Sequence, residues 1–268
     1  MKSQKLEWNP MLSQLELGRV CVILVRARNP SNIGAVARAM YDFGFSRLRV
    51  VNEFPVPFEA ARSAVDASEV LAGATLYASL AEAVADCTLI VGTTAVGERD
   101  LQHELLPLAQ AAPRIRAELQ RSDESRVALL FGSEKTGLSN DELSHCNWLL
   151  TIPMQIHEDA RHPSMNLGQA VAVCLYDLVR EQQDGSHAVT NETPGVVAAP
   201  TAANLERITE LLLQIMEKTG YDHRYPHNCN PAQVRRLVRR IGVDAVDAPV
   251  WMGILRQILW KLDEKPPS

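Results

Sequence analysis

Apolar residues along this chain form short runs that alternate with longer segments of helical period. The runs VCVILV (residues 20–25), RLRVV (47–51), TLIVGTT (88–94), VALLF (127–131) and WLLTI (148–152) predict strands. Helices are predicted at residues 29–44 and 79–87, after Pro107, and at 165–182. Strands interleaved with helices in this way predict an α/β fold, a mostly parallel sheet with helices on both faces.

The character of the sequence changes after residue 181. Residues 182–204 are small, polar and rich in Pro and Gly, without a sustained period, which predicts a linker. Helical period returns at residues 205–218, 232–241 and 248–262. We therefore expect a main domain over residues 1–181, a linker over 182–204, and a small all-helical C-terminal module over 205–268.

Composition places the chain among ordinary globular proteins, since 46% of its 268 residues are apolar and 22% are charged. The longest apolar run near the start, residues 20–25, is far shorter than the roughly 20 residues that span a bilayer. The N-terminus also lacks the apolar core of a signal peptide. We expect a cytoplasmic protein with no membrane partner. Its five scattered cysteines predict buried, reduced thiols.

Basic residues gather in two stretches, although the net charge is −5. Six arginines and one acidic residue lie between residues 19 and 49, and five arginines and one acidic residue between 222 and 240. Such stretches are typical of a surface that binds phosphates. Solvated edges of helices and strands would give the same pattern, so charge alone leaves both readings open.

A glycine loop, FGSEKTGLS, follows the strand predicted at residues 127–131. Gly132 and Gly137 have the spacing of a phosphate-binding loop, but Leu138 stands where that loop requires lysine. We therefore reject a nucleoside triphosphate site, whereas backbone amides could still contact an uncharged or zwitterionic ligand. Ser139 and Glu142 have the spacing of a capping box for the next helix.

The helix predicted at residues 29–44 begins with a polar turn. Asn29 is expected to cap it and Gly44 to end it. Asn32 lies in the first turn, beside backbone N–H groups that favour anions. Gly34 and Arg38 are expected to share one side, where the glycine leaves space for a ligand. An amphipathic helix with a surface arginine would fit the same pattern.

The segment before the last helix of the main domain is also polar. Ser164 is expected to cap this helix, with Asn166 in its first turn. His157 and His162 precede it, close to acidic residues, but their spacing matches no common ligand set, and we expect no metal. The sequence contains neither a dinucleotide-binding fingerprint nor a nucleophile motif.

Three motifs in this order resemble those of the SPOUT-class RNA ribose methyltransferases, the SpoU/TrmH group. They are N-x-G-x-x-x-R from Asn32 to Arg38, FGSEKTGL, and IP…PSMNLGQAVAVCLY. The resemblance covers about residues 20–181, and the helical tail is similar to the C-terminal extension of the TrmJ subfamily. It implies a trefoil knot, a homodimer, the cofactor S-adenosylmethionine, and methylation of a ribose 2′-hydroxyl in the tRNA anticodon loop, at cytidine or uridine 32.

The resemblance also assigns roles to individual residues. Arg38 matches the arginine that handles the 2′-hydroxyl proton and Asn32 the partner that orients it, with Ser164 and Asn166 completing the catalytic set. Ribosomal RNA methylation by the same chemistry and an inactive RNA-binding protein are the alternatives. The candidates for cofactor binding are Thr93, Thr94, Ala95, Gly132, Glu134, Ile152, Ser164, Met165 and Asn166; those for RNA binding are Arg28, Arg235, Arg236, Arg239 and Arg240.

Overall fold

The computed structural model describes residues 11–52, 67–95, 101–155, 165–180 and 198–264. Its centre is a seven-stranded sheet in the order β3-β2-β1-β6-β4-β7-β5, and every strand pair is parallel. The predicted α/β class is therefore confirmed. The strands are β1 (Val20–Val25), β2 (Arg47–Val51), β3 (Thr75–Tyr77), β4 (Leu89–Thr93), β5 (Leu105–Pro107), β6 (Val127–Phe131) and β7 (Trp148–Thr151).

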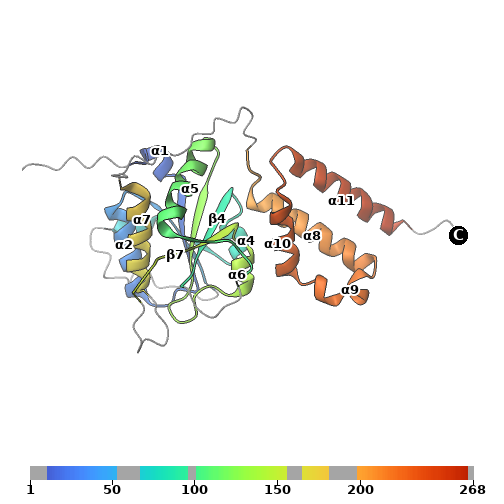
Figure 1. Ribbon diagram of the computed structural model, residues 1–268, viewed down its shortest axis with the longest axis horizontal. Coiled ribbons are helices and arrows are strands. Elements are labelled where there is room, and N and C mark those ends of the chain that lie inside the picture. The colour runs from blue at the N-terminus through green and yellow to red at the C-terminus, as the bar shows by residue number, and fades with distance from the viewer. Residues whose placement is uncertain (1–10, 53–66, 96–100, 156–164, 181–197, 265–268) are drawn as a thin grey trace, which may run out of the picture.

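Helices cover both faces of the sheet (Figure 1). On one face lie α2 (Pro30–Asp42), α5 (Leu108–Arg121) and α7 (Leu167–Val179), and the short helices α1 (Gln14–Leu17) and α3 (Ser68–Ala72) join the same core. On the other face lie α4 (Leu80–Ala83) and α6 (Asn140–Ser144). Strand β1 contributes side chains to the apolar cores on both faces of the sheet, because alternate residues of a strand point to opposite faces. Its six residues are all buried, as a parallel sheet covered on both faces requires.

Local signals fixed the start and end of α2 as the sequence predicted. The side chain of Asn29 accepts a hydrogen bond from the backbone N–H of Ser31, and Pro30 occupies the first turn. Gly44 follows the helix with φ of 81°, a left-handed conformation that glycine adopts at little cost. The five cysteines lie unpaired in the structure, and four of them are buried, whereas Cys229 is half-buried.

The C-terminal module comprises α8 (Ala202–Lys218), α9 (Tyr221–Arg224), a 3-10 turn (Pro226–Asn228), α10 (Pro231–Ile241) and α11 (Asp247–Asp263). A separate apolar core joins α8, α10 and α11. Figure 1 shows the module beside the α4 and α6 face of the sheet. Helix α8 begins at Ala202, inside the predicted linker, and the N–H of Ala202 donates to the carbonyl of Cys87 at 2.8 Å. The end of that stretch is therefore docked on the main domain.

Sequence reasoning missed the shortest elements, the three-residue strands β3 and β5 and the helices α1, α3 and α9. Runs of three to five residues give too few positions for a period to be recognised. Among the described residues, no helix is both long enough and apolar enough to span a membrane.

Candidate active site

The glycine loop after β6 folds back on itself. The N–H of Gly137 donates to the carbonyl of Ser133 at 2.9 Å, and Gly137 has φ of 63°. A Cβ atom on Gly132 would lie only 2.2 Å from the carbonyl carbon of Gly137 and 2.3 Å from the nitrogen of Leu138. Because both contacts are with backbone, only glycine fits this position. The predicted capping box of Ser139 and Glu142 is present at the start of α6.

Residues from the three sequence motifs meet in one hydrogen-bonded row. The amide nitrogen of Asn32 donates to Glu134 Oε1 at 2.9 Å, and the amide nitrogen of Asn166 donates to Asn32 Oδ1 at 3.1 Å. Asn32 is on α2, Glu134 is in the glycine loop, and Asn166 directly precedes α7. The row therefore joins positions more than 100 residues apart in the chain.

Asn166 has a different structural place from the one predicted. It is the N-cap of α7, not a first-turn residue, and its Oδ1 accepts from the backbone N–H of Gly168 at 3.0 Å. The side-chain amide of Asn166 thus caps the start of α7 with its oxygen and binds Asn32 with its nitrogen. Ser164, the predicted cap, lies outside the described residues, and Met165 is half-buried.

Gly34 is buried on α2, the helix that packs against α7. The two helices approach closely, because a Cβ on Gly168 would lie 2.6 Å from that of Ala35. The space for a ligand beside Gly34 stays a prediction.

Arg38 extends from α2 with 41% of its side chain exposed, and its Nε lies 3.1 Å from Asp42 Oδ1. The hydrogen bonds of Asn32 go to Glu134 and Asn166, not to Arg38. Six residues of α-helix separate the two by about 9 Å along the axis. Among the described residues no hydrogen bond joins Asn32 to Arg38, and the orienting role of Asn32 stays a prediction.

Thr93 ends β4 in its last ladder pair, with Leu150, and Thr94 and Ala95 follow the strand. The hydroxyl of Thr93 donates to the carbonyl of Leu130 at 2.8 Å, and the N–H of Thr94 donates to that of Leu150 at 3.0 Å. The segment is thus tied to both neighbouring strands, β6 and β7. Ile152, just after β7, is half-buried against the main core. The cofactor candidates that are described lie after the carboxyl ends of β4, β6 and β7 and at the start of α7, the edge where open α/β sheets bind ligands.

Sequence reasoning missed Arg26, which anchors the glycine loop. Its guanidinium makes two bonds to the carboxylate of Glu142, at 2.6 and 2.9 Å, and a third to the carbonyl of Gly137 at 3.0 Å. Burial raises the pKa of Glu142, but the bonds from Arg26 and from the N–H of Ser139 outweigh it and hold that pKa below its usual value. Arg26 has φ of 56°, rare for a residue with a side chain, and such strain is common at functional sites.

The predicted RNA-binding arginines separate into exposed and enclosed side chains. Arg28 and Arg240 are exposed and Arg236 is half-buried. Arg235 is only 9% exposed and binds Glu206 through two bonds of 2.8 and 2.9 Å. It also donates to Ser144 Oγ on α6 at 2.7 Å, so it holds the module against the main domain.

Arg239 is enclosed as well. Its Nε and Nη2 are buried without a hydrogen-bond partner among the described residues, and burial lowers its pKa to about 10. The described residues contain no group of three or more His, Cys, Asp or Glu side chains that could hold a metal, while His157 and His162 lie outside them.

Comparison with known proteins places the chain in a family. The model of the SpoU rRNA Methylase family matches residues 19–176. The tRNA (cytidine/uridine-2′-O-)-methyltransferase TrmJ of Pectobacterium atrosepticum is 32% identical over 255 residues, which cover 92% of this chain and 100% of that protein. TrmJ of Sodalis glossinidius is also 32% identical, over 246 residues that cover 90% of this chain and 92% of the relative.

A solved structure supports the same assignment. The crystal structure of TrmJ from Z. mobilis ZM4 superposes with a TM-score of 0.73 at 27% identity, covering 89% of this chain and 98% of that one. The match therefore includes the C-terminal module as well as the sheet. In its sequence and in its fold, this chain belongs to the SpoU methylase family and, within it, to the TrmJ group.

Proposed function

We propose that this protein transfers a methyl group from S-adenosylmethionine to a ribose 2′-hydroxyl in the anticodon loop of tRNA, at cytidine or uridine 32. The observation that carries the proposal is the hydrogen-bonded row of Glu134, Asn32 and Asn166, since it brings the three family motifs into one place. The TrmJ relatives are named as tRNA (cytidine/uridine-2′-O-)-methyltransferases, which supports tRNA as the substrate class.

The residues at this edge of the sheet fit the cofactor. Thr93 to Ala95, Gly132 with Glu134, Ile152, and Ser164 to Asn166 are the segments that would hold it. Gly132 lets the two arms of the glycine loop pack backbone against backbone, since a Cβ there would lie 2.2 Å from the carbonyl carbon of Gly137. Glu134 would place a carboxylate near the positively charged sulfonium of S-adenosylmethionine. S-adenosylmethionine supplies an activated methyl group on its sulfonium, so the protein has mainly to position the ribose oxygen.

Arg38 is proposed to stabilise the negative charge that develops on the ribose oxygen, and an RNA phosphate would accept the proton. An arginine is a poor base, because its pKa exceeds about 12. Asn32, Ser164 and Asn166 would then shape the site around the reacting groups. The Nε of Arg38 binds Asp42 one turn further along α2.

The Arg38→Lys variant tests this role, because it keeps the charge and removes the two-pronged geometry. We expect kcat to fall about a hundredfold, as when one donor to a developing oxyanion is lost, and the affinity for S-adenosylmethionine to stay unchanged by calorimetry. Full activity of the lysine variant would contradict the proposed geometry.

Exposed cations would bind the tRNA backbone. Arg28 and Arg240 are exposed and Arg236 is half-exposed, whereas Arg235 and Arg239 would support that surface from within. Affinity should fall steeply as salt rises. We further propose a cytoplasmic homodimer with a trefoil knot and no metal, in which residues 1–181 catalyse and residues 205–268 contribute RNA binding beyond the linker.

Mass spectrometry of nucleosides tests the function directly. We expect tRNA from cells that lack the gene to lose one 2′-O-methylated pyrimidine, and the purified protein with S-adenosylmethionine to restore it. Loss of a methylated nucleoside from ribosomal RNA instead would overturn the choice of substrate. Binding of RNA without binding of S-adenosylmethionine would identify an inactive RNA-binding protein.

A further inference from the structure

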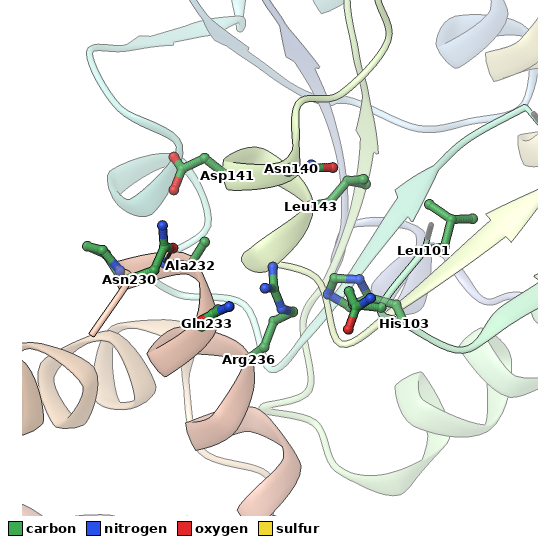
Figure 2. Close-up of a pocket in the computed structure, with 11 residues that line it drawn as sticks. Leu101, His103, Asn140, Asp141, Leu143, Asn230, Ala232, Gln233 and Arg236 are labelled. Carbon is green, nitrogen blue, oxygen red and sulfur yellow. Dashed lines mark hydrogen bonds between the residues drawn. The ribbon is translucent and has the colours of Figure 1, made fainter. Parts of the chain in front are cut away.

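A cavity lies where the C-terminal module meets the main domain (Figure 2). Its volume is 380 Å³, within the range of roughly 300–1,000 Å³ of small-ligand pockets. The walls are α6, the start of α10, and the segment that precedes β5. None of the residues predicted for cofactor binding lines it. The uncharged polar and basic side chains in these walls are Gln102, His103, Asn140, Asn230, Gln233 and Arg236.

The walls of this pocket carry the guanidinium of Arg236 and an imidazole nitrogen of His103 that has no hydrogen-bond partner among the described residues. In Figure 2, Arg236 extends from α10 towards α6, and His103 lies on the wall formed by the other domain. The Nε2 atom of His103 is buried and has no hydrogen-bond partner among the described residues. Buried polar atoms are rarely left unpaired, so this atom points to a missing ligand or water.

The charges around the pocket favour an anion. Burial, followed by the fields of Arg236, Arg239 and Arg240, lowers the pKa of His103, so its ring is neutral near pH 7. The acidic side chain in the wall is Asp141, which lies 3.2 Å from Arg235. For Arg236 and Arg240, the described part of the chain provides no carboxylate partner. Positive charge therefore exceeds negative charge at this face.

The other wall groups match a nucleobase. Side-chain amides carry both donors and acceptors, the combination found on base edges. Leu101, Leu143 and Pro231 supply apolar surface between these amides. A guanidinium for phosphate, amides for a base edge and apolar contacts for its ring together describe a nucleotide site.

We propose that this pocket binds one nucleotide of the RNA substrate, near the one that is methylated, with its phosphate on Arg236 and its base against His103 and the amides. The inference rests on the proposed function and adds a second RNA contact to it. Helix α6 links the two places, since it starts directly after the glycine loop and Glu142 within it binds Arg26. An occupied pocket would thus fix the RNA relative to the catalytic edge.

Two pocket variants and a matched control test this site. His103→Phe keeps a ring and removes both nitrogens without a change of charge near pH 7. Arg236→Gln removes the cation, and Arg256→Gln removes an exposed arginine of α11 that lies outside the pocket. We expect each pocket variant to bind tRNA about tenfold more weakly, as when a hydrogen bond to a charged or buried group is lost. The control should change affinity less than about twofold.

Affinity for S-adenosylmethionine, measured by calorimetry, should stay at the wild-type value in all three variants. If His103→Phe binds tRNA like the wild type while Arg236→Gln only matches Arg256→Gln, diffuse charge explains binding and the pocket proposal is wrong. A wild-type protein that binds tRNA but does not methylate it would refute the proposed function, and the comparison of the variants would still test the pocket.

Crosslinking separates RNA from a free nucleotide. With tRNA that contains 4-thiouridine, we expect crosslinked peptides to include residues 101–103 or 230–236, and cytidine 5′-monophosphate to compete only at high concentration. Tight binding of cytidine 5′-monophosphate that tRNA does not displace would assign the pocket to a free nucleotide and overturn the RNA proposal.

Discussion

Two arginines in this protein make nearly the same contacts and do different work. Arg26 and Arg235 each bind a glutamate through two nitrogens, Glu142 in one case and Glu206 in the other. Each also has a third bond to another part of the chain, to the carbonyl of Gly137 and to Ser144 Oγ respectively. The first set holds the glycine loop at the end of β1, and the second holds the C-terminal module on α6.

The difference teaches that position, and not residue type, decides what a paired arginine contributes. Planar two-nitrogen pairing makes arginine suited to fix two segments in one geometry. At the edge proposed to bind the cofactor this fixes the glycine loop, so its loss should appear in cofactor binding. At the domain boundary it fixes a whole module, so its loss should appear in RNA binding.

Arg26→Ala should have the largest effect, on the affinity for S-adenosylmethionine. The variant removes the ion-pair partner of Glu142 and the donor to the carbonyl of Gly137, and with them the anchor of the loop. We expect the affinity for S-adenosylmethionine to fall about a hundredfold, the scale of losing one partner of a part-buried pair. Calorimetry measures this, with Arg47→Ala, an exposed arginine at the start of β2, as the control. Unchanged affinity in Arg26→Ala would show that the loop needs no anchor.

Arg235→Ala should weaken the binding of tRNA. We expect tRNA affinity to fall about tenfold, since the module is no longer held in one orientation, with cofactor affinity unchanged. Glu206→Gln is the discriminating variant, because it removes the charge that Arg235 pairs with and leaves the arginine in place. A similar loss in both variants supports a structural role. Stronger tRNA binding by Glu206→Gln would show instead that Arg235 contacts the RNA directly.

His145→Gln concerns the domain boundary and is expected to change stability, not ligand binding. Burial, then the field of Arg235, lowers the pKa of His145 to about 4, from an ordinary value of 6.5. Between these values the unfolded chain binds a proton that the folded protein excludes, so this stability is present above pH 6.5 and is lost as the pH falls towards 4.

The wild type should therefore lose about 2 kcal/mol of unfolding free energy through His145 between pH 7 and pH 5. The glutamine variant should lose less over the same interval. Urea unfolding at the two pH values measures the difference. Equal pH dependence of the two proteins would mean that the folded state accommodates the charged ring.

Sequence reasoning succeeded wherever a property depends on near neighbours in the chain. The buried strands are continuous apolar runs, the cap of α2 is Asn29, and the capping box of Ser139 is complete within four residues. It failed where two distant segments compete for one group. Asn166 caps α7 with its oxygen, the role expected of Ser164, while its nitrogen binds Asn32 on a distant helix.

For charged residues, too, the sequence does not predict which side chains are paired within the protein. Arg235 and Arg236 are adjacent and look alike in the sequence, yet the first is paired within the protein and the second faces a pocket. Their directions differ because neighbours on a helix are about 100° apart. Which direction meets solvent depends on Glu206 of α8 and Ser144 of α6, which lie 29 and 91 residues from Arg235 in the chain.

By itself the sequence determined the parallel α/β class, the capped helices, the glycine loop and the order of the three motifs, because short-range sterics, hydrogen bonding and apolar period set these features. Only the tertiary structure decided that Glu134, Asn32 and Asn166 form one row, that Arg26 holds the loop, and that Arg235 joins two domains. The physical reason is that a hydrogen bond is specified by distance and direction between two groups, and for groups far apart in the chain both are set by packing.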